Sequence, residues 1–165
     1  SKPLFFRDEL DRVVYDIVSE NDKVLDLGCG DKGRTRNLNK GNKILSVDAW
    51  EKVNPDLILD VEKDGLPFEK DSFDVVLMLD FVEHLEKEVG EKLIEKAKEV
   101  CSKRLLVFTP KFWTDNKDNV NNPELWCYNN EFDLHKSLWH EEDFRGWSTI
   151  PYSDDRFFLK MWSKR

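Results

Sequence analysis

The feature that most constrains this chain is an apolar strand that leads directly into a glycine-rich turn. Residues 24–30 have the sequence Val-Leu-Asp-Leu-Gly-Cys-Gly, and Gly33 follows shortly after. Glycine permits tight turns and lets a ligand approach the main chain closely. In an open α/β sheet, ligands bind beyond the carboxyl ends of the strands, where such turns lie. The segment therefore predicts a parallel sheet with a ligand site at this turn.

Apolar patterning along the rest of the chain predicts strands that alternate with helices. Stripes with helical spacing predict helices at 10–18 and 89–101, and we also expect short helices from the glycine turn to about Lys40 and at 140–144. Apolar runs predict strands at 23–27, 43–47, 57–61, 73–79, 104–108, 149–150 and 157–162. Because only a short polar turn separates the last two strands, we expect them to pair antiparallel.

The alternation predicts an α/β fold with a doubly wound, mostly parallel seven-stranded sheet and an antiparallel last strand. A chain of 165 residues suggests one domain, spanning 1–165. The connections on either side of the third strand have no room for a long helix. We therefore expect one face of the sheet to be thinly covered, or covered by a partner.

Composition narrows the setting and the partners. The net charge of −8 lacks the basic excess of a dedicated duplex binder, so nucleic acid is a poor candidate for a partner. No apolar run reaches the roughly 20 residues of a membrane span, and residues 1–20 do not have the pattern of a signal peptide. The three cysteines are widely spaced, which favours a reducing cytoplasmic location. The oligomeric state is left open.

Two carboxylates near the glycine turn bear on the identity of the ligand. Gly28, Gly30 and Gly33 spell the dinucleotide fingerprint, and Asp48 follows Gly28 by 20 residues, where it can accept ribose hydroxyls. Asp26, however, would repel a pyrophosphate, whereas it would attract the cationic amino-acid end of S-adenosylmethionine. The residues favour S-adenosylmethionine, with a NAD-dependent oxidoreductase or a catalytically silent binding module as alternatives.

Several segments together resemble the class I S-adenosylmethionine-dependent methyltransferases. The matching stretches, in order, are VLDLGCG, ILSVDAW, LPFEKDSFDVVLMLD and FVEHL, which cover roughly residues 22–110. A looser match, His-Lys-Ser-Leu-Trp at 135–139 followed by Glu-Asp-Phe at 142–144, is similar to small methyltransferases associated with cell-surface sugars. The third glycine departs from the family's GxGxG pattern, so the turn is expected to be one residue longer.

The resemblance implies a Rossmann-like methyltransferase fold and a set of cofactor contacts. Asp26 would face the methionine amino group, and Asp48 would hold the ribose hydroxyls. Trp50 would stack on adenine, although packing explains a tryptophan equally well, and Asp60 would bind the adenine amino group or cap a loop. The other positions implied around the cofactor are Gly28, Cys29, Gly30, Ala49, Val61 and Leu79.

The expected reaction is methyl transfer to an oxygen or nitrogen atom of a small-molecule or sugar-like acceptor. Asp80 and His84 follow the fourth strand and are the candidates for accepting a proton from the acceptor. A structural role at the start of a helix is equally open for His84. His135 and His140 are too isolated in the sequence for a metal site, so no metal is expected.

The segment 111–140 has no clear periodicity and contains six aromatic residues and six asparagines. A loop of this length is usually functional or disordered, and its aromatic content argues against disorder. We expect an acceptor lid or, equally, a segment that only seals the sheet edge. The candidate walls of an acceptor site are Trp113, Trp126, Tyr128 and Trp139.

Overall fold

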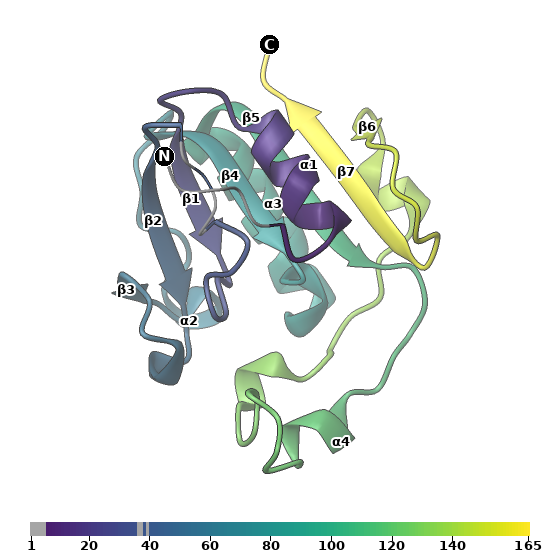
Figure 1. Cartoon of the computed structure of the whole chain (residues 1–165). Coiled ribbons are helices and arrows are strands. Elements are labelled where there is room, and N and C mark those ends of the chain that lie inside the picture. Colours follow the sequence, from purple (N-terminus) through teal and green to yellow (C-terminus); the bar gives the residue numbers. More distant parts are fainter. Residues whose placement is uncertain (1–5, 36–37, 39) are drawn as a thin grey trace.

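The computed structural model describes residues 6–35, 38 and 40–165 and forms one seven-stranded sheet of order β3-β2-β1-β4-β5-β7-β6 (Figure 1). Every described pair of neighbouring strands is parallel except the two pairs that contain β7. The strands are β1 (Lys23–Leu27), β2 (Lys43–Asp48), β3 (Leu57–Ile58), β4 (Phe73–Leu79), β5 (Cys101–Pro110), β6 (Ser148–Thr149) and β7 (Phe157–Ser163). The expected doubly wound sheet with an antiparallel last strand is confirmed.

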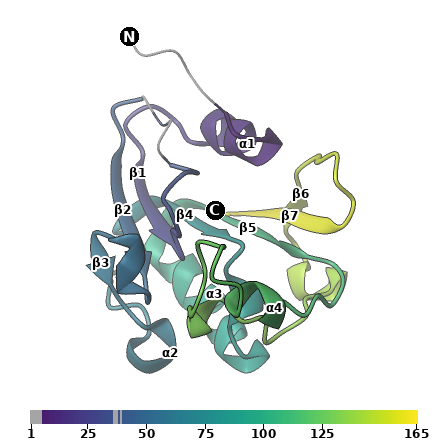
Figure 2. The ribbon, with the colours of Figure 1, turned by 60° about the horizontal axis from the view of Figure 1, so that its bottom comes forward.

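Helices cover both faces of the sheet. Helix α1 (Glu9–Ile17) lies on one face, and the single turn α2 (Val61–Asp64) and helix α3 (Lys87–Val100) lie on the other (Figure 2). A further turn, α4 (Lys117–Val120), lies beyond the carboxyl ends of the parallel strands (Figure 1). The 3₁₀ turns are η1 (Glu51–Val53), η2 (Val82–His84), η3 (Glu131–Asp133) and η4 (Glu141–Phe144). The sheet therefore separates two hydrophobic clusters.

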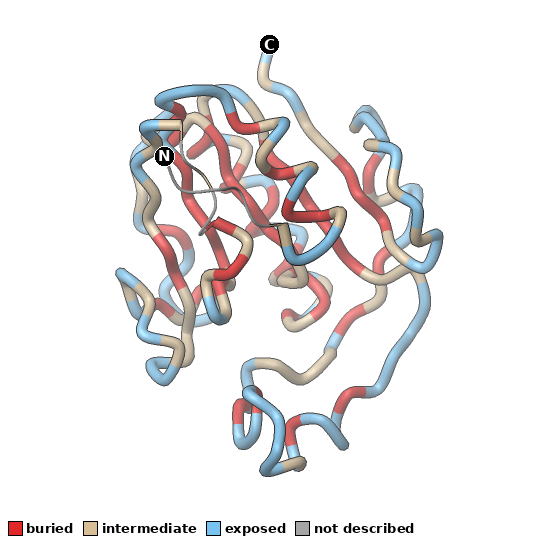
Figure 3. The backbone as a smooth tube through the Cα atoms, in the orientation of Figure 1, coloured by how far each residue is buried: buried red, intermediate tan, exposed pale blue. Residues whose placement is uncertain are grey.

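Local sequence explains where these elements begin and why they are buried. The Asp8 carboxylate caps α1 by accepting from the Asp11 N–H, and the apolar stripe of this helix packs on the sheet. Strand β4 is buried over most of its length, as expected for a parallel strand covered on both faces. Figure 3 shows these buried strands at the centre of the molecule.

Three local expectations need correction. The third strand ends at Ile58 rather than at residue 61, because Asp60 caps the helical turn α2 through the Glu62 N–H. Strand β5 extends beyond the expected 104–108 at both ends. The helix expected up to Lys40 is not found: residues 31–35 form turns, and residues 36, 37 and 39 lie outside the described part of the chain.

The two connections that flank β3 in the sequence contain little helix, so the sheet is thinly covered there, as expected. The connection before β3 contains only the 3₁₀ turn η1, and the connection after it contains only the single turn α2.

None of the helices formed by the described residues combines the length and apolar character that crossing a membrane requires.

The segment 111–140 crosses beyond the carboxyl ends of the parallel strands (Figure 1). It is held by its own polar contacts: the Asn116 amide donates to the Asp133 carbonyl over 2.5 Å, and the Asn129 N–H donates to the Val120 carbonyl over 2.8 Å. At its end, Trp139 is only 1% exposed and lies in the hydrophobic core.

Gly90 allows α3 to pack against this tryptophan. A Cβ atom at residue 90 would lie 2.6 Å from Cζ2 of Trp139. We expect Gly90→Ala to lower the free energy of unfolding by about 1–3 kcal/mol, because overpacking a filled core outweighs the better helix propensity of alanine. Thermal denaturation would measure this, with the exposed neighbour Glu91→Ala as control. Equal stability of the two variants would contradict the packing role.

Candidate active site

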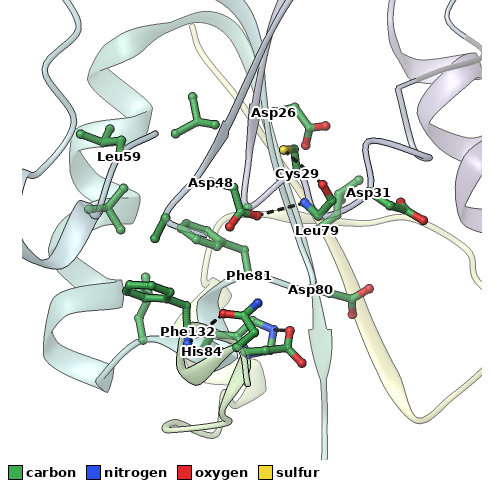
Figure 4. A pocket seen from close by; sticks show the side chains of 18 of the residues that line it. Asp26, Cys29, Asp31, Asp48, Leu59, Leu79, Asp80, Phe81, His84 and Phe132 are labelled. Atoms are coloured by element: carbon green, nitrogen blue, oxygen red, sulfur yellow. Dashed lines mark hydrogen bonds and ion pairs between the residues drawn. The ribbon is translucent and has the colours of Figure 1, made fainter. Parts of the chain in front are cut away.

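A cavity of about 300 Å³ lies where β1, β2 and β4 end (Figure 4). Asp26, Cys29 and Asp48 lie together in one part of it, and Asp80, His84 and Phe132 lie in another. Most of the residues that the sequence predicts around a cofactor line this cavity: Asp26, Gly28, Cys29, Gly30, Asp48, Ala49, Asp60, Val61 and Leu79.

The glycine turn lines the cavity. Gly28 has φ +68°, and a Cβ atom there would lie 2.4 Å from the Phe81 ring, so only glycine fits without strain. The N–H groups of Gly28 and Cys29 both donate to the Val47 carbonyl, over 2.8 and 3.0 Å. At Gly33, a Cβ atom would overlap the Arg7 guanidinium at 2.0 Å. The third glycine therefore makes room for Arg7.

Asp48 joins the glycine turn to the end of β2. One carboxylate oxygen accepts from the Gly30 N–H over 3.0 Å, and the other accepts from the Trp50 N–H over 2.9 Å. A carboxylate has about four acceptor positions, so capacity remains for further hydroxyl donors. The side chain is thus oriented toward the cavity before any ligand binds.

Asp26 is buried in the same cavity, with 3% exposure. Burial raises the pKa of its carboxyl to about 7, and the negative charge of Asp48 adds to this rise. The Thr35 hydroxyl, which donates to Asp26 over 3.2 Å, and the nearby Arg34 oppose it. A cation placed beside Asp26 would stabilise the ionised form.

The described residues that line the cavity carry an excess of negative charge. Seven are acidic and three are basic: Asp26, Asp31, Asp48, Asp60, Glu62, Asp80 and Asp133, against Arg7, Arg34 and Lys136. Carboxylates attract a cationic ligand and repel phosphate groups. The electrostatics therefore favour a positively charged ligand over a dinucleotide.

Two arginines in the cavity wall were missed by the sequence predictions. Arg34 pairs with Asp8 and, over 2.8 Å, with Asp11 of α1, and Arg7 pairs with Asp11 over 3.2 Å. Arg34 directly follows Gly33 of the glycine turn, and its ion pairs with Asp8 and Asp11 connect this turn to the start of α1, beside Arg7. No local motif signals this, because the contacts depend on how α1 docks.

A second cavity of about 430 Å³ adjoins the first and is covered by the segment 111–140. Asp80, His84, Trp126 and Asp133 line both cavities. Asp80 has φ +51°, a left-handed conformation that is strained for a residue other than glycine.

The candidate aromatic walls behave differently from one another. Trp126 is 60% exposed, and its ring centroid lies 6.3 Å from that of Trp50, which does not itself line the cavity. Trp113 and Tyr128 are exposed and line neither cavity. Trp139 is corrected from an acceptor wall to a core residue, because its ring packs against Gly90 and its Nε1–H donates to the Ser137 hydroxyl.

The proton-accepting candidates lie at the junction of the two cavities. Burial raises the pKa of Asp80 to about 6, and burial lowers the pKa of His84, which favours its neutral form. Burial also raises the pKa of the neighbouring Glu83, with the Asp80 charge as the next cause. Burial raises the pKa of Cys29 to about 12, so this thiol has no thiolate character near neutrality.

Comparisons with known proteins identify the kind of domain that this chain contains. Residues 25–106 match the family model described as a methyltransferase domain. No curated protein matches the sequence. An S-adenosylmethionine-dependent methyltransferase from Archaeoglobus fulgidus has 15% identity and a TM-score of 0.66, covering 93% of this chain and 90% of its own.

Two further solved structures share the fold. The PH0226 protein from Pyrococcus horikoshii OT3 has 17% identity and a TM-score of 0.64, with 94% of this chain and 88% of its own covered. A putative Zn-dependent alcohol dehydrogenase from Rhodobacter sphaeroides has 10% identity and a TM-score of 0.67, with the same coverages of 94% and 88%. At these identities the likeness concerns the fold alone.

We expect Asp26 to make ligand binding depend on pH. We expect S-adenosylhomocysteine, which carries an ammonium group, to bind about tenfold more weakly at pH 6 than at pH 8, because the Asp26 carboxyl with a pKa of about 7 must lose its proton. Calorimetry across this range would measure the dependence. Asp26→Asn should bind more weakly and with a flatter pH profile. An unchanged pH profile in this variant would contradict the assignment, because the dependence would then arise from another carboxyl group of the cavity, such as Asp80 with its pKa of about 6.

Proposed function

The chain belongs to the class I S-adenosylmethionine-dependent methyltransferases, and we propose from that premise that it methylates an oxygen or nitrogen atom of a small polar acceptor. The cofactor would occupy the first cavity and the acceptor the second. The observation that carries this proposal is the junction of the two cavities, at which Asp80 and His84 line both.

The residues of the first cavity fit S-adenosylmethionine. Asp48 retains acceptor capacity for ribose hydroxyls, and Asp26 is buried where an ammonium group would offset its charge. Arg7, which pairs with Asp11 and Asp31 over 3.2 Å, also lines this cavity and supplies a positive group for the methionine carboxylate. The excess of carboxylates argues against the pyrophosphate of NAD and therefore against the oxidoreductase alternative.

When bound, the cofactor supplies a methyl group on a positively charged sulfur, whose bond to the methyl carbon breaks as the acceptor atom bonds to that carbon. The protein's part is to align the two ligands, which is worth on the order of 7–11 kcal/mol, and to exclude water. An acceptor hydroxyl or ammonium also loses a proton, and Asp80 or neutral His84 receives it. Demethylated cofactor and methylated acceptor are the products.

The second cavity combines aromatic faces with polar groups. Phe112, Trp126 and Phe157 provide rings, and Asn119 provides an amide, whereas the Asn116 amide is already bonded to Asp133 and His135. Rings that stack on apolar faces and amides that bind hydroxyl edges suit a sugar-like molecule, and they also suit a small polar aromatic acceptor. The segment 111–140 supplies most of these groups, which supports its role as an acceptor lid.

The cofactor assignment is tested by calorimetry with S-adenosylhomocysteine and NAD. We expect the first to bind and the second to give no heat of binding. Asp48→Ala should weaken S-adenosylhomocysteine at least tenfold, because each charge-assisted bond to a ribose hydroxyl contributes about 1.5–3 kcal/mol. Circular dichroism would verify that the variant folds. Tight NAD binding without a response to S-adenosylhomocysteine would refute the proposal.

Substitutions of the three tryptophans in the segment 111–140 distinguish an acceptor lid from a segment that only seals the sheet edge. Trp126→Ala should raise the acceptor KM in a methyl-transfer assay and leave the melting temperature unchanged, because Trp126 is exposed and lines both cavities. Trp113→Ala is the matched control, exposed but away from both cavities, and should change neither quantity. Trp139→Ala should lower stability by about 3–5 kcal/mol. Parallel loss of stability in the Trp126 variant would favour the seal.

A further inference from the structure

Two histidines that are distant in the sequence meet at the junction of the two cavities. The ring centroids of His84 and His135 are 5.1 Å apart. Together with Glu83 they present one possible metal-ligand atom each, all within 4.8 Å of one another. The expectation that His135 is too isolated for a metal site is therefore wrong, because the segment 111–140 folds so that His135 lies beside His84.

Backbone hydrogen bonds hold the two halves of this cluster in place. The Glu83 carbonyl accepts from the N–H groups of Lys136 and Ser137, over 2.7 and 3.1 Å. The Ser137 hydroxyl donates to the Val82 carbonyl over 3.0 Å. The two residues that follow His135 are thus bonded to the 3₁₀ turn η2, which carries Glu83 and His84, so the three side chains are arranged before any ligand arrives.

The hydrogen bond of His135 determines which of its nitrogens is available. Nδ1 lies 2.6 Å from the Thr114 carbonyl, which can only accept, so Nδ1 carries the proton and Nε2 presents a lone pair. A backbone carbonyl that orients an imidazole in this way is a common feature of metal-binding histidines. The His135 N–H is also held, by the Asn116 amide oxygen over 2.9 Å.

His84 supplies an independent observation. Its Nδ1 atom is buried and has no hydrogen-bond partner among the described residues. Buried polar atoms without a partner are uncommon and call for an explanation, which a bound ion would give.

The surrounding charge is suited to a cation. The second cavity contains three carboxylates, from Asp80, Glu83 and Asp133, and one guanidinium, from Arg156. That guanidinium already pairs with Asp154 over 2.7 Å. A cation at the cluster would therefore face an excess of negative charge.

We propose that Glu83, His84 and His135 bind one divalent transition-metal ion at the junction of the two cavities. Two imidazoles and a carboxylate are a donor set typical of zinc and of other first-row metals. Tetrahedral bonds of about 2.0 Å place ligand atoms about 3.3 Å apart, so the side chains must approach one another slightly on binding. The Thr109 hydroxyl, which donates to the Glu83 carboxylate over 3.1 Å, orients this ligand.

Metal binding itself does not depend on the proposed function, but its catalytic use does. An ion at this position would hold an acceptor hydroxyl and lower its pKa, as Lewis-acidic metals do. His84 would then act as a ligand, which leaves Asp80 to receive the proton. The acceptor class favoured by this arrangement is one with a hydroxyl group that can coordinate the ion.

The test is zinc titration by calorimetry on the full chain after treatment with a chelator. We expect one Zn²⁺ per chain with a micromolar or tighter dissociation constant. His135→Ala and Glu83→Gln should each weaken zinc at least tenfold. His140→Ala is the matched control, because it removes the remaining histidine, which is exposed and outside the cluster, and it should bind zinc like the unaltered chain.

S-adenosylhomocysteine binding, measured on the same samples, separates the two proposals. The His135 variant should keep its affinity for this ligand, which also shows that it is folded even if the buried Glu83 variant is not. Zinc binding without S-adenosylhomocysteine binding would support the metal site and refute the proposed function. Absence of zinc binding, or equal zinc affinity in the His135 and His140 variants, would overturn the metal site.

Discussion

The geometry of the first cavity depends on the hydrogen bonds that the Asp48 carboxylate accepts. By accepting from the N–H groups of Gly30 and Trp50, it connects the end of β2 to the turn that follows β1. That turn adopts a positive φ at Gly28 and approaches the Phe81 ring after β4. Together with the hydrogen bonds of Gly28 and Cys29 to the Val47 carbonyl, this side chain holds the ends of β1 and β2 beside Phe81, which follows β4.

The concentration of carboxylates around this cavity lowers the stability of the folded protein when no ligand is bound. Asp26 has a pKa of about 7 when folded and 3.8 as its ordinary value, so the folded state binds more protons between these values. Its contribution to stability is complete below pH 3.8 and is lost as the pH rises through 7. A cationic ligand offsets this loss at neutral pH, which links ligand binding to stability.

The sequence predicted those features that arise from local patterns. The buried run at 73–79 and the glycine turn identified the sheet and the ligand edge, because apolar runs and glycines act through neighbouring residues. The sequence predictions missed Arg34, although it directly follows Gly33, and they missed Arg7, which reaches the cavity through the docking of α1. Nor did the sequence reveal the contact between His84 and His135, because that contact depends on the path of the segment 111–140, whose sequence has no clear periodicity.

Trp139 shows how a core residue can serve the site without touching it. Its ring fills the space left by Gly90, and its Nε1–H donates to the Ser137 hydroxyl, which in turn donates to the Val82 carbonyl. The same serine N–H donates to the Glu83 carbonyl, so the core anchors the end of the segment 111–140 beside η2. Trp126, near the middle of the segment, stays exposed. A segment anchored at one end in this way can keep His135 and Asp133 fixed beside Asp80 while its exposed part adapts to an acceptor.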